Sequence, residues 1–338
     1  MSTPAAAFIP GLGWLPADSG LIPLRTGGGG RFRAGADGVT SIHATGDRKV
    51  ELIAFRAART QRAGHTLAYV GSGLGYPAFY PLHEVGLERP VRAVLMDLDG
   101  TSVHSEGFWM GIIEQTVASL LDNPRFSLEP ADLPFVSGHS VSEHLQYCVT
   151  KYCPGRTVEQ ARALYFEHAR REMRAILEGR GRADAFRPAA GLKEFLLALK
   201  AAGIRIALVT SGLYEKAYPE IVAAFRALGL GDPADFYDAI ITAGYPLGRG
   251  AAGTLGELTP KPHPWLYAEA ARVGLGIPFG ERNRVVGIED SGAGVCAIRL
   301  AGFPTIGLAG GNIEASGTRA LCSHYCADLA EVWRVVGG

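Results

Sequence analysis

The stretch that most constrains this chain is residues 91–101, which read VRAVLMDLDGT. Its largely apolar residues run up to Asp97, which is typical of a strand buried on both faces of a parallel sheet. Two carboxylates, Asp97 and Asp99, end this strand, and buried aspartates are rare unless they are paired or bind a metal. Because open α/β sheets hold ligands at the carboxyl ends of their strands, we predict the active site here.

The spacing of Asp97 and Asp99 suits two carboxylates with different tasks. They lie two residues apart, so both side chains face the same way on a regular strand. One carboxylate can attack while the other gives or takes a proton, and a carboxylate with a backbone carbonyl also suits Mg²⁺. A solvated turn or part of a Ca²⁺ loop would show the same DxDG pattern. The rest of the chain has to separate these interpretations.

Composition sets loose bounds on the protein. The 338 residues predict about two domains, and a hydrophobic fraction of 47% is ample for a core. The formal net charge is zero, with no long run of one sign, so we expect no nucleic-acid or membrane partner. Every apolar run is too short for a transmembrane helix, and the first residues make a poor signal peptide. The sequence does not reveal the oligomeric state.

The cysteines indicate a reducing compartment. Five cysteines without a dense framework fit free thiols, so we expect a cytoplasmic protein. Cys322, His324 and Cys326 lie close enough together to suggest zinc, but no second ligand pair follows them, which weighs against a zinc site.

The first 90 residues differ from the remainder. Residues 1–33 are rich in glycine and proline, which predicts a flexible or loosely packed leader. Segments 49–56, 66–71 and 78–85 carry β-branched and aromatic residues between turn signals, so a small antiparallel sheet is plausible. No catalytic motif occurs here, and oligomer contact, shielding of the active site and substrate selection are all open roles.

Beyond residue 90 the pattern predicts an α/β core with a helical insertion. Apolar residues recur at helical spacing over residues 108–121 and 158–177, with a shorter helix at 140–149. From residue 188 onward, helices at 192–202, 214–228, 264–273 and 294–301 alternate with strands at 205–210, 237–242 and 284–288. This alternation predicts a doubly wound parallel sheet formed by residues 91–106 and 188–338, with residues 107–187 as a helical cap over the strand ends.

Three further segments carry reactive residue types. Thr210, Ser211 and Gly212 offer a hydroxyl and backbone N–H groups, which suit a phosphate oxygen or an ordinary helix N-cap. Lys261 stands between two prolines, which favours a fixed role over that of a mobile surface lysine. Glu289 and Asp290 end another apolar strand, where they could cap a helix or complete a cation site with Asp97.

These four strand ends, taken in order over residues 91–329, resemble the haloacid dehalogenase-like hydrolase superfamily. Further segments, among them KPHPWLYAEAARVGLG and GIEDSGAGVCAIRLAGF, look like the branch that includes β-phosphoglucomutase and many small-metabolite phosphatases. The resemblance implies a Rossmann-like core whose helical cap is inserted between the first and second motifs. Residues 107–187 occupy that place here.

The resemblance also implies a mechanism. Asp97 would attack phosphorus and form an aspartyl-phosphate, and Asp99 would protonate the leaving alkoxide and then activate water. Mg²⁺ would be held by Asp97, the Asp99 carbonyl and Asp290, with Glu289 acting through water. Lys261 and Thr210 would hold the transferring oxygens, with Ser211 and Gly212 beside them. We therefore expect an Mg²⁺-dependent phosphatase acting on a small phosphorylated metabolite such as a sugar phosphate.

Other members of the superfamily fit the sequence less well. Its dehalogenases do without the second acid, Asp99, and without Mg²⁺, and its ATPase pumps need membrane segments. Phosphonoacetaldehyde hydrolases form a Schiff base on a cap lysine, and the context of Lys151, the only lysine of residues 107–187, does not match. His104 stands in the loop after the first motif where relatives often have aspartate, so the flap that governs cap closure would titrate near neutral pH.

The closest alternative is a sugar phosphomutase. The cap segment FVSGHSVSEHL, residues 135–145, contains Gly138 and Ser140, which are similar to the substrate-recognition loop of β-phosphoglucomutase. The arginine with which that mutase holds the far phosphate aligns with Val141, so hydrolysis is favoured. His139 and His144 are candidates to touch a polar substrate, or are ordinary exposed or packed histidines. A non-catalytic phosphometabolite-binding protein is a further alternative, although such a protein needs no paired Asp97 and Asp99.

Overall fold

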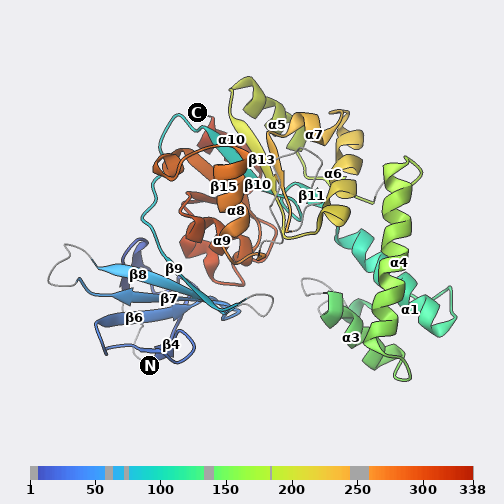
Figure 1. Cartoon of the computed structure of the whole chain (residues 1–338), viewed down its shortest axis with the longest axis horizontal. Coiled ribbons are helices and arrows are strands. Elements are labelled where there is room, and N and C mark those ends of the chain that lie inside the picture. Colours follow the sequence, from blue (N-terminus) through green and yellow to red (C-terminus); the bar gives the residue numbers. More distant parts are fainter. Residues whose placement is uncertain are drawn as a thin grey trace. The chain divides into compact units, whose positions relative to one another are not determined.

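The computed structural model describes residues 7–57, 64–71, 76–132, 141–182, 185–243 and 259–337, without the side chains of residues 141–143. The chain forms two compact units (Figure 1). The first, the core unit, comprises Met1–Ser102, Ala189–Ala217 and Leu230–Gly338, and the second, the cap unit, comprises Val103–Pro188 and Tyr218–Gly229. The N-terminal residues therefore belong to the same unit as the α/β core.

The core unit is built around a six-stranded parallel sheet of order β14-β13-β10-β15-β16-β17. All five residues of β10 are buried, as the run of apolar residues before Asp97 predicts. The predicted α/β doubly wound class is confirmed. The strands are β10 (Ala93–Asp97), β13 (Arg205–Val209), β14 (Ala239–Ile241), β15 (Val285–Glu289), β16 (Thr305–Leu308) and β17 (His324–Cys326).

Helices cover the face of the sheet to which Ala93, Leu95 and Val285 point. Ala93, Leu95 and Val285 pack there against α8 (Trp265–Glu269), the single π turn Ala270–Gly274 and α9 (Gly292–Ala301). Ser291 caps α9 by accepting the Gly294 N–H at 3.1 Å. The remaining helices are α5 (Leu192–Ala201), α6 (Tyr214–Leu228), α7 (Pro233–Phe236) and α10 (Leu329–Val336).

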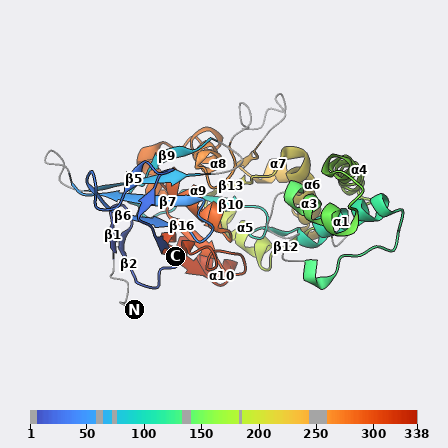
Figure 2. The same cartoon turned by 90° about the horizontal axis from the view of Figure 1, so that it is seen from below.

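An antiparallel sheet precedes this core, drawn in blue in Figures 1 and 2. Its strand order is β3-β6-β7-β8-β9, and two short hairpins, β1–β2 and β4–β5, accompany it. The N-terminal strands are β1 (Ala7–Ile9), β2 (Gly13–Leu15), β3 (Ile22–Pro23), β4 (Thr26–Gly27), β5 (Phe32–Arg33), β6 (Val39–Ala44), β7 (Val50–Phe55), β8 (His65–Val70) and β9 (Ala78–Pro81).

The expectation of a loosely packed leader is wrong for the described residues from Ala7 onward. Ile9 and Leu15 are 0% and 3% exposed, and they pack in one cluster with Val295 and Leu300 of α9. Here glycine allows two backbone segments to approach closely rather than making the chain flexible. A Cβ on Gly20 would lie 2.7 Å from the Cα of Gly317. A high glycine content has both meanings, and only the tertiary contact distinguishes them.

The cap unit is helical apart from one short strand pair, β11 (Val103–His104) with β12 (Arg187–Pro188). Its described helices are α1 (Glu106–Leu121), the 3-10 turn Pro130–Asp132, α3 (Val141–Tyr152), α4 (Val158–Leu177) and the part of α6 from Tyr218 onward. Thr157 and Gln160 form a complete capping box at the start of α4. The helices predicted at 108–121, 140–149 and 158–177 are therefore present, with shifts of a few residues at some ends.

Asp132 is the polar centre of the cap. Its carboxylate is fully buried and accepts hydrogen bonds from Tyr147 at 2.6 Å, Tyr152 at 2.5 Å and Lys151 at 2.7 Å. Burial alone would raise the pKa of Asp132, but the bonds from Lys151 and the two tyrosines outweigh it and hold that pKa well below its usual range. The cluster ties α3 to the preceding turn.

Elements near the C-terminus were not anticipated from the sequence. β16 and β17 extend the sheet beyond residue 301, and α10 follows them. Within β17, His324 is exposed whereas Cys326 is buried, although residues two apart on a strand face the same side of the sheet. Among the described residues, no group with metal-ligand geometry includes Cys322, His324 or Cys326.

No helix among the described residues has the length and apolar character needed to cross a membrane.

Candidate active site

Two neighbouring strands deliver the central carboxylates. β10 ends at Asp97 and pairs in parallel with β15, which ends at Glu289 and is followed by Asp290. Ligand atoms of Asp97, Glu289 and Asp290 all lie within 4.8 Å of one another. Residues almost two hundred positions apart therefore form one acidic cluster, because parallel strands end at the same edge of a sheet.

Lys261 lies among these carboxylates. Its ammonium donates a hydrogen bond to Asp97 Oδ1 and another to Glu289 Oε1, the latter at 2.6 Å, and it lies 3.3 Å from the Val209 carbonyl. The side chain is 7% exposed, so these contacts replace water. The Lys261 backbone N–H donates to Ser211 Oγ at 3.2 Å, which ties the lysine loop to the end of β13.

Glu289 is fully buried, and both of its oxygens are already engaged. Oε1 accepts from Lys261 and from the Tyr267 hydroxyl at 2.8 Å, and Oε2 accepts from the Ser291 hydroxyl at 2.9 Å. The carboxylate lies so close to α9 that a Cβ on Gly294 would fall 1.8 Å from it. This arrangement suits a carboxylate that holds Lys261 in place.

The Asp290 carboxylate is closely packed against the backbone of the DLDGT motif. Thr101 donates to Asp290 Oδ1 at 3.2 Å. A Cβ on Gly100, whose φ is +87°, would lie 2.2 Å from Asp290 Oδ2, so the glycine of the DLDGT motif is required for space as well as for its left-handed backbone.

Burial and mutual repulsion shift the protonation of this cluster. Burial raises the pKa of Asp97 well above its usual range, the Glu289 and Asp290 charges add to this, and Lys261 opposes it. Burial and the Glu289 charge raise the pKa of Asp290 to about 7. Burial would lower the pKa of Lys261, but Asp97 and Glu289 outweigh it and keep the ammonium charged.

The cluster has the donor chemistry of a magnesium site. It gathers buried hard oxygen donors whose mutual repulsion a divalent cation would relieve, and Mg²⁺ prefers such ligands. Asp97 and Asp290 are the two carboxylates of the cluster not fully engaged by internal bonds. The residues present therefore fit the expected cation.

The predicted phosphate-binding residues lie at the end of β13. Thr210 is 1% exposed, and its hydroxyl accepts the Gly212 N–H at 2.9 Å. Ser211 is exposed, and its hydroxyl accepts from the Lys261 backbone. Thr210, Ser211 and Gly212 thus form a compact turn that is bonded to the lysine loop.

Asp99 lies on the more open side of the cluster. Its side chain is 37% exposed, and Lys216 Nζ lies 3.5 Å from its Oδ1. Lys216 was not anticipated, and neither were the contacts that Thr101 and Tyr267 make with the cluster. Thr101 follows the DLDG motif directly, whereas no local pattern marks Lys216 or Tyr267, which reach the site only through the packing of α6 and α8.

Residues predicted for substrate selection belong to the cap. Gly138, His139 and Ser140 lie outside the described residues, and His144 lies on α3. His104 is exposed on β11. Lys151 forms ion pairs with Asp132 and Glu129 at 2.7 and 2.8 Å, which raise its pKa and disfavour the neutral amine that a Schiff base requires.

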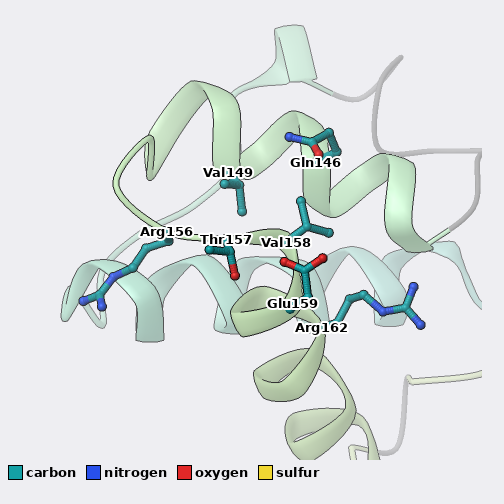
Figure 3. Close-up of a pocket in the computed structure, with 7 residues that line it drawn as sticks. All are labelled: Gln146, Val149, Arg156, Thr157, Val158, Glu159 and Arg162. Atoms are coloured by element: carbon teal, nitrogen blue, oxygen red, sulfur yellow. The ribbon is translucent and has the colours of Figure 1, made fainter.

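A hollow of about 580 Å³ also opens between α3 and α4 of the cap unit (Figure 3). The side chains of Arg156 and Arg162 point to opposite sides of it, and Glu159 lies between them. No predicted site residue lines this hollow, and its two arginines point apart rather than toward a common point. The lining residues are Gln146, Val149, Arg156, Thr157, Val158, Glu159 and Arg162.

Comparison with protein families decides the classification. A family model described as haloacid dehalogenase-like hydrolase matches residues 91–302. The chain belongs to this haloacid dehalogenase-like hydrolase family. The match begins just before the first core strand, so the N-terminal sheet lies outside the matched residues. A search of curated proteins found no match.

Several solved structures have a similar fold. CbbY from Rhodobacter sphaeroides, crystallised with phosphate, is 21% identical at a TM-score of 0.51, covering 72% of this chain and 96% of its own. A predicted phosphoglycolate phosphatase from Haemophilus somnus 129pt is 18% identical at a TM-score of 0.54, covering 73% and 98%. A protein provisionally assigned as β-phosphoglucomutase from Thermotoga maritima has 18% identity, a TM-score of 0.53 and the same coverage. At these identities the similarity is one of fold.

Proposed function

We propose that this member of the haloacid dehalogenase-like hydrolase family is an Mg²⁺-dependent phosphatase acting on a small phosphorylated metabolite. The observation that carries the proposal is the contact between the Lys261 ammonium and the Asp97 carboxylate, inside a cluster whose acidic atoms lie within 4.8 Å of one another. It supplies a nucleophile, a cation for the phosphoryl oxygens and donors for a metal in one place.

In the proposed reaction, Asp97 attacks phosphorus and forms an aspartyl-phosphate. Lys261 orients the nucleophile in the free enzyme and compensates negative charge on the phosphoryl oxygens as the bond to the leaving group breaks. The turn formed by Thr210, Ser211 and Gly212 offers a hydroxyl and backbone donors for the same oxygens. Mg²⁺ held by Asp97, Asp290 and the Asp99 carbonyl would reduce the repulsion between the two anions.

Asp99 is the proposed general acid and base. Its side chain is partly exposed, so it can reach a leaving oxygen that the buried Asp97 cannot. It gives its proton to the departing alkoxide and takes one from the water that then hydrolyses the aspartyl-phosphate. Glu289 is proposed to act through Lys261 rather than as a direct metal ligand, because Lys261, Tyr267 and Ser291 already occupy its oxygens.

Two observations favour a phosphomonoester as the substrate class. An alkoxide leaving group needs a proton, which the partly exposed Asp99 can donate, whereas a halide leaves without one. Among the fold relatives, CbbY was crystallised with phosphate. Lys151 argues against a phosphonate substrate, because its pairing with buried Asp132 disfavours Schiff-base chemistry.

The test is release of inorganic phosphate from p-nitrophenyl phosphate and then from a panel of phosphorylated metabolites, each with Mg²⁺ and with EDTA. Mg²⁺-dependent release supports the phosphatase. Turnover of a hexose 1-phosphate that requires a bisphosphate primer, without release from monoesters, would instead indicate the phosphomutase. Binding of phosphorylated compounds with no turnover would indicate a non-catalytic binding protein.

A further inference from the structure

The N-terminal sheet contacts the loop that carries Lys261. His263, two residues after the lysine, is 1% exposed, and its Nδ1 lies 2.7 Å from the Tyr80 hydroxyl of β9. The Tyr80 ring also meets the rings of His263 and Trp265 edge-on, with centroids 5.8 and 5.9 Å apart. One N-terminal side chain therefore contacts two residues that lie two and four positions after Lys261.

The surroundings of His263 determine its protonation state and its hydrogen-bond partner. Burial lowers the pKa of His263, so the ring is neutral and one nitrogen can accept or donate in the bond to Tyr80. Within the described part of the chain, Nε2 has no hydrogen-bond partner, so Tyr80 supplies the ring's one polar contact there. The His263 backbone N–H donates to the Pro260 carbonyl at 3.2 Å, which closes the turn around Lys261.

The segment that carries Tyr80 is anchored to the core independently of this contact. Arg299 of α9 is 2% exposed, and its guanidinium donates to the Gly11 carbonyl at 3.0 Å and to the His83 carbonyl at 3.4 Å. His83 follows β9 closely, and Leu82 joins the apolar cluster that contains Leu300. Tyr80 therefore projects from a fixed support toward the lysine loop.

We propose that Tyr80 is a positioning residue for Lys261, acting through His263, so that the N-terminal sheet is part of the active-site framework. The importance of Lys261 rests on the proposed function. Tyr80 touches neither the acidic cluster nor any proposed substrate contact. Its task is to hold the turn of residues 260–263 so that the ammonium reaches Asp97 and Glu289.

The positioning is tested without relying on catalysis by competitive acetylation of lysines in the full-length protein, read by mass spectrometry. Lys261 is buried and paired, so it reacts slowly in the wild type. In Tyr80→Phe we expect its labelling to rise about tenfold, because the loop opens more often. Lys200 belongs to the same unit and forms an ion pair with Asp238 at 2.9 Å, so it serves as the internal reference, and its labelling should not change.

Matched variants separate positioning from general loosening of the sheet. Tyr69→Phe removes a hydroxyl from β8 of the same sheet and should leave Lys261 labelling unchanged. His263→Leu removes the other partner of the bond and should reproduce Tyr80→Phe, and the double variant should be no worse than either single variant. Should Tyr80→Phe fail to fold, His263→Leu alone carries the comparison.

Turnover gives the second readout. With p-nitrophenyl phosphate and Mg²⁺ we expect kcat about tenfold lower in Tyr80→Phe, since small displacements of a catalytic group are costly. Unchanged labelling of Lys261 in Tyr80→Phe and His263→Leu, or an equal rise in Tyr69→Phe, overturns the inference. If the wild type hydrolyses no phosphate ester but labelling responds as expected, the proposed function fails and the positioning stands.

Discussion

The Lys261 ammonium lies 2.6 Å from Glu289 Oε1, and both side chains are almost completely removed from water. The pair joins the end of β15 to the loop before α8. Because Lys261 also contacts Asp97, Glu289 fixes the distance between the proposed nucleophile and its cation.

Replacing Asp97 by Asn removes the proposed nucleophile. We expect turnover of any accepted phosphate ester to fall by at least about 10³-fold, because a carboxamide cannot form the aspartyl-phosphate. Phosphate release with Mg²⁺ measures this, and a wild-type melting transition shows that the fold is retained. Undiminished turnover in Asp97→Asn would refute the assignment.

Asp99→Asn should separate the two chemical steps. p-Nitrophenolate leaves without a proton, so the variant should release about one equivalent per enzyme in a rapid burst and then stall, since water is no longer activated. An alkyl phosphate should show no burst, and its turnover should fall by about 10²-fold or more. Equal losses for both substrates, without a burst, would exclude Asp99 as the acid and base.

Asp290 is tested through the metal. Treatment with EDTA should stop turnover, and Mg²⁺ should restore it. In Asp290→Asn, the half-saturating Mg²⁺ concentration should rise at least about tenfold, because one anionic ligand is lost. Asp18→Asn removes an exposed carboxylate and should leave the half-saturating Mg²⁺ concentration unchanged. A normal Mg²⁺ requirement in Asp290→Asn would remove Asp290 from the site.

Glu289→Gln should cost stability as well as activity. It leaves a buried ammonium with one carboxylate fewer, so we expect the free energy of unfolding to fall by about 3 kcal/mol, as when one partner of a buried ion pair is removed. Urea titration measures this. Glu314→Gln breaks a pair with Arg319 in which both side chains are more than half exposed, and should change stability by less than about 1 kcal/mol. Equal effects of the two substitutions would contradict the account.

Asp132 should make the cap sensitive to acid. Hydrogen bonds from Lys151, Tyr147 and Tyr152 outweigh burial and lower its pKa in the folded state. The stabilisation is therefore complete above the carboxyl's ordinary pKa, near 4, and is lost as the pH falls toward the lower folded value. The thermal midpoint of the wild type should exceed that of Asp132→Asn at pH 7, and the gap should narrow below about pH 4. A gap independent of pH would show that ionisation of Asp132 is not the cause.

Much of the core could be predicted because its signals are local. The apolar run before Asp97, the buried strand before Glu289 and the alternation of helices and strands identify a parallel sheet, whose strands must end at one edge. Helix 158–177 begins and ends at the residues that its apolar periodicity indicates. In contrast, β16 and β17 are only four and three residues long, too short for a recognisable period.

The sequence by itself determined the fold class, the order of the four motifs and the residue types gathered at the strand ends, because each is written in a short continuous segment. The tertiary structure decided that the Glu289 oxygens accept hydrogen bonds from Lys261, Tyr267 and Ser291. It also decided that Lys216 lies beside Asp99 and that the glycine-rich N-terminal segment packs on α9. These contacts join residues far apart in the chain. Their energies depend on burial and close approach, which leave no periodic or local mark in the sequence.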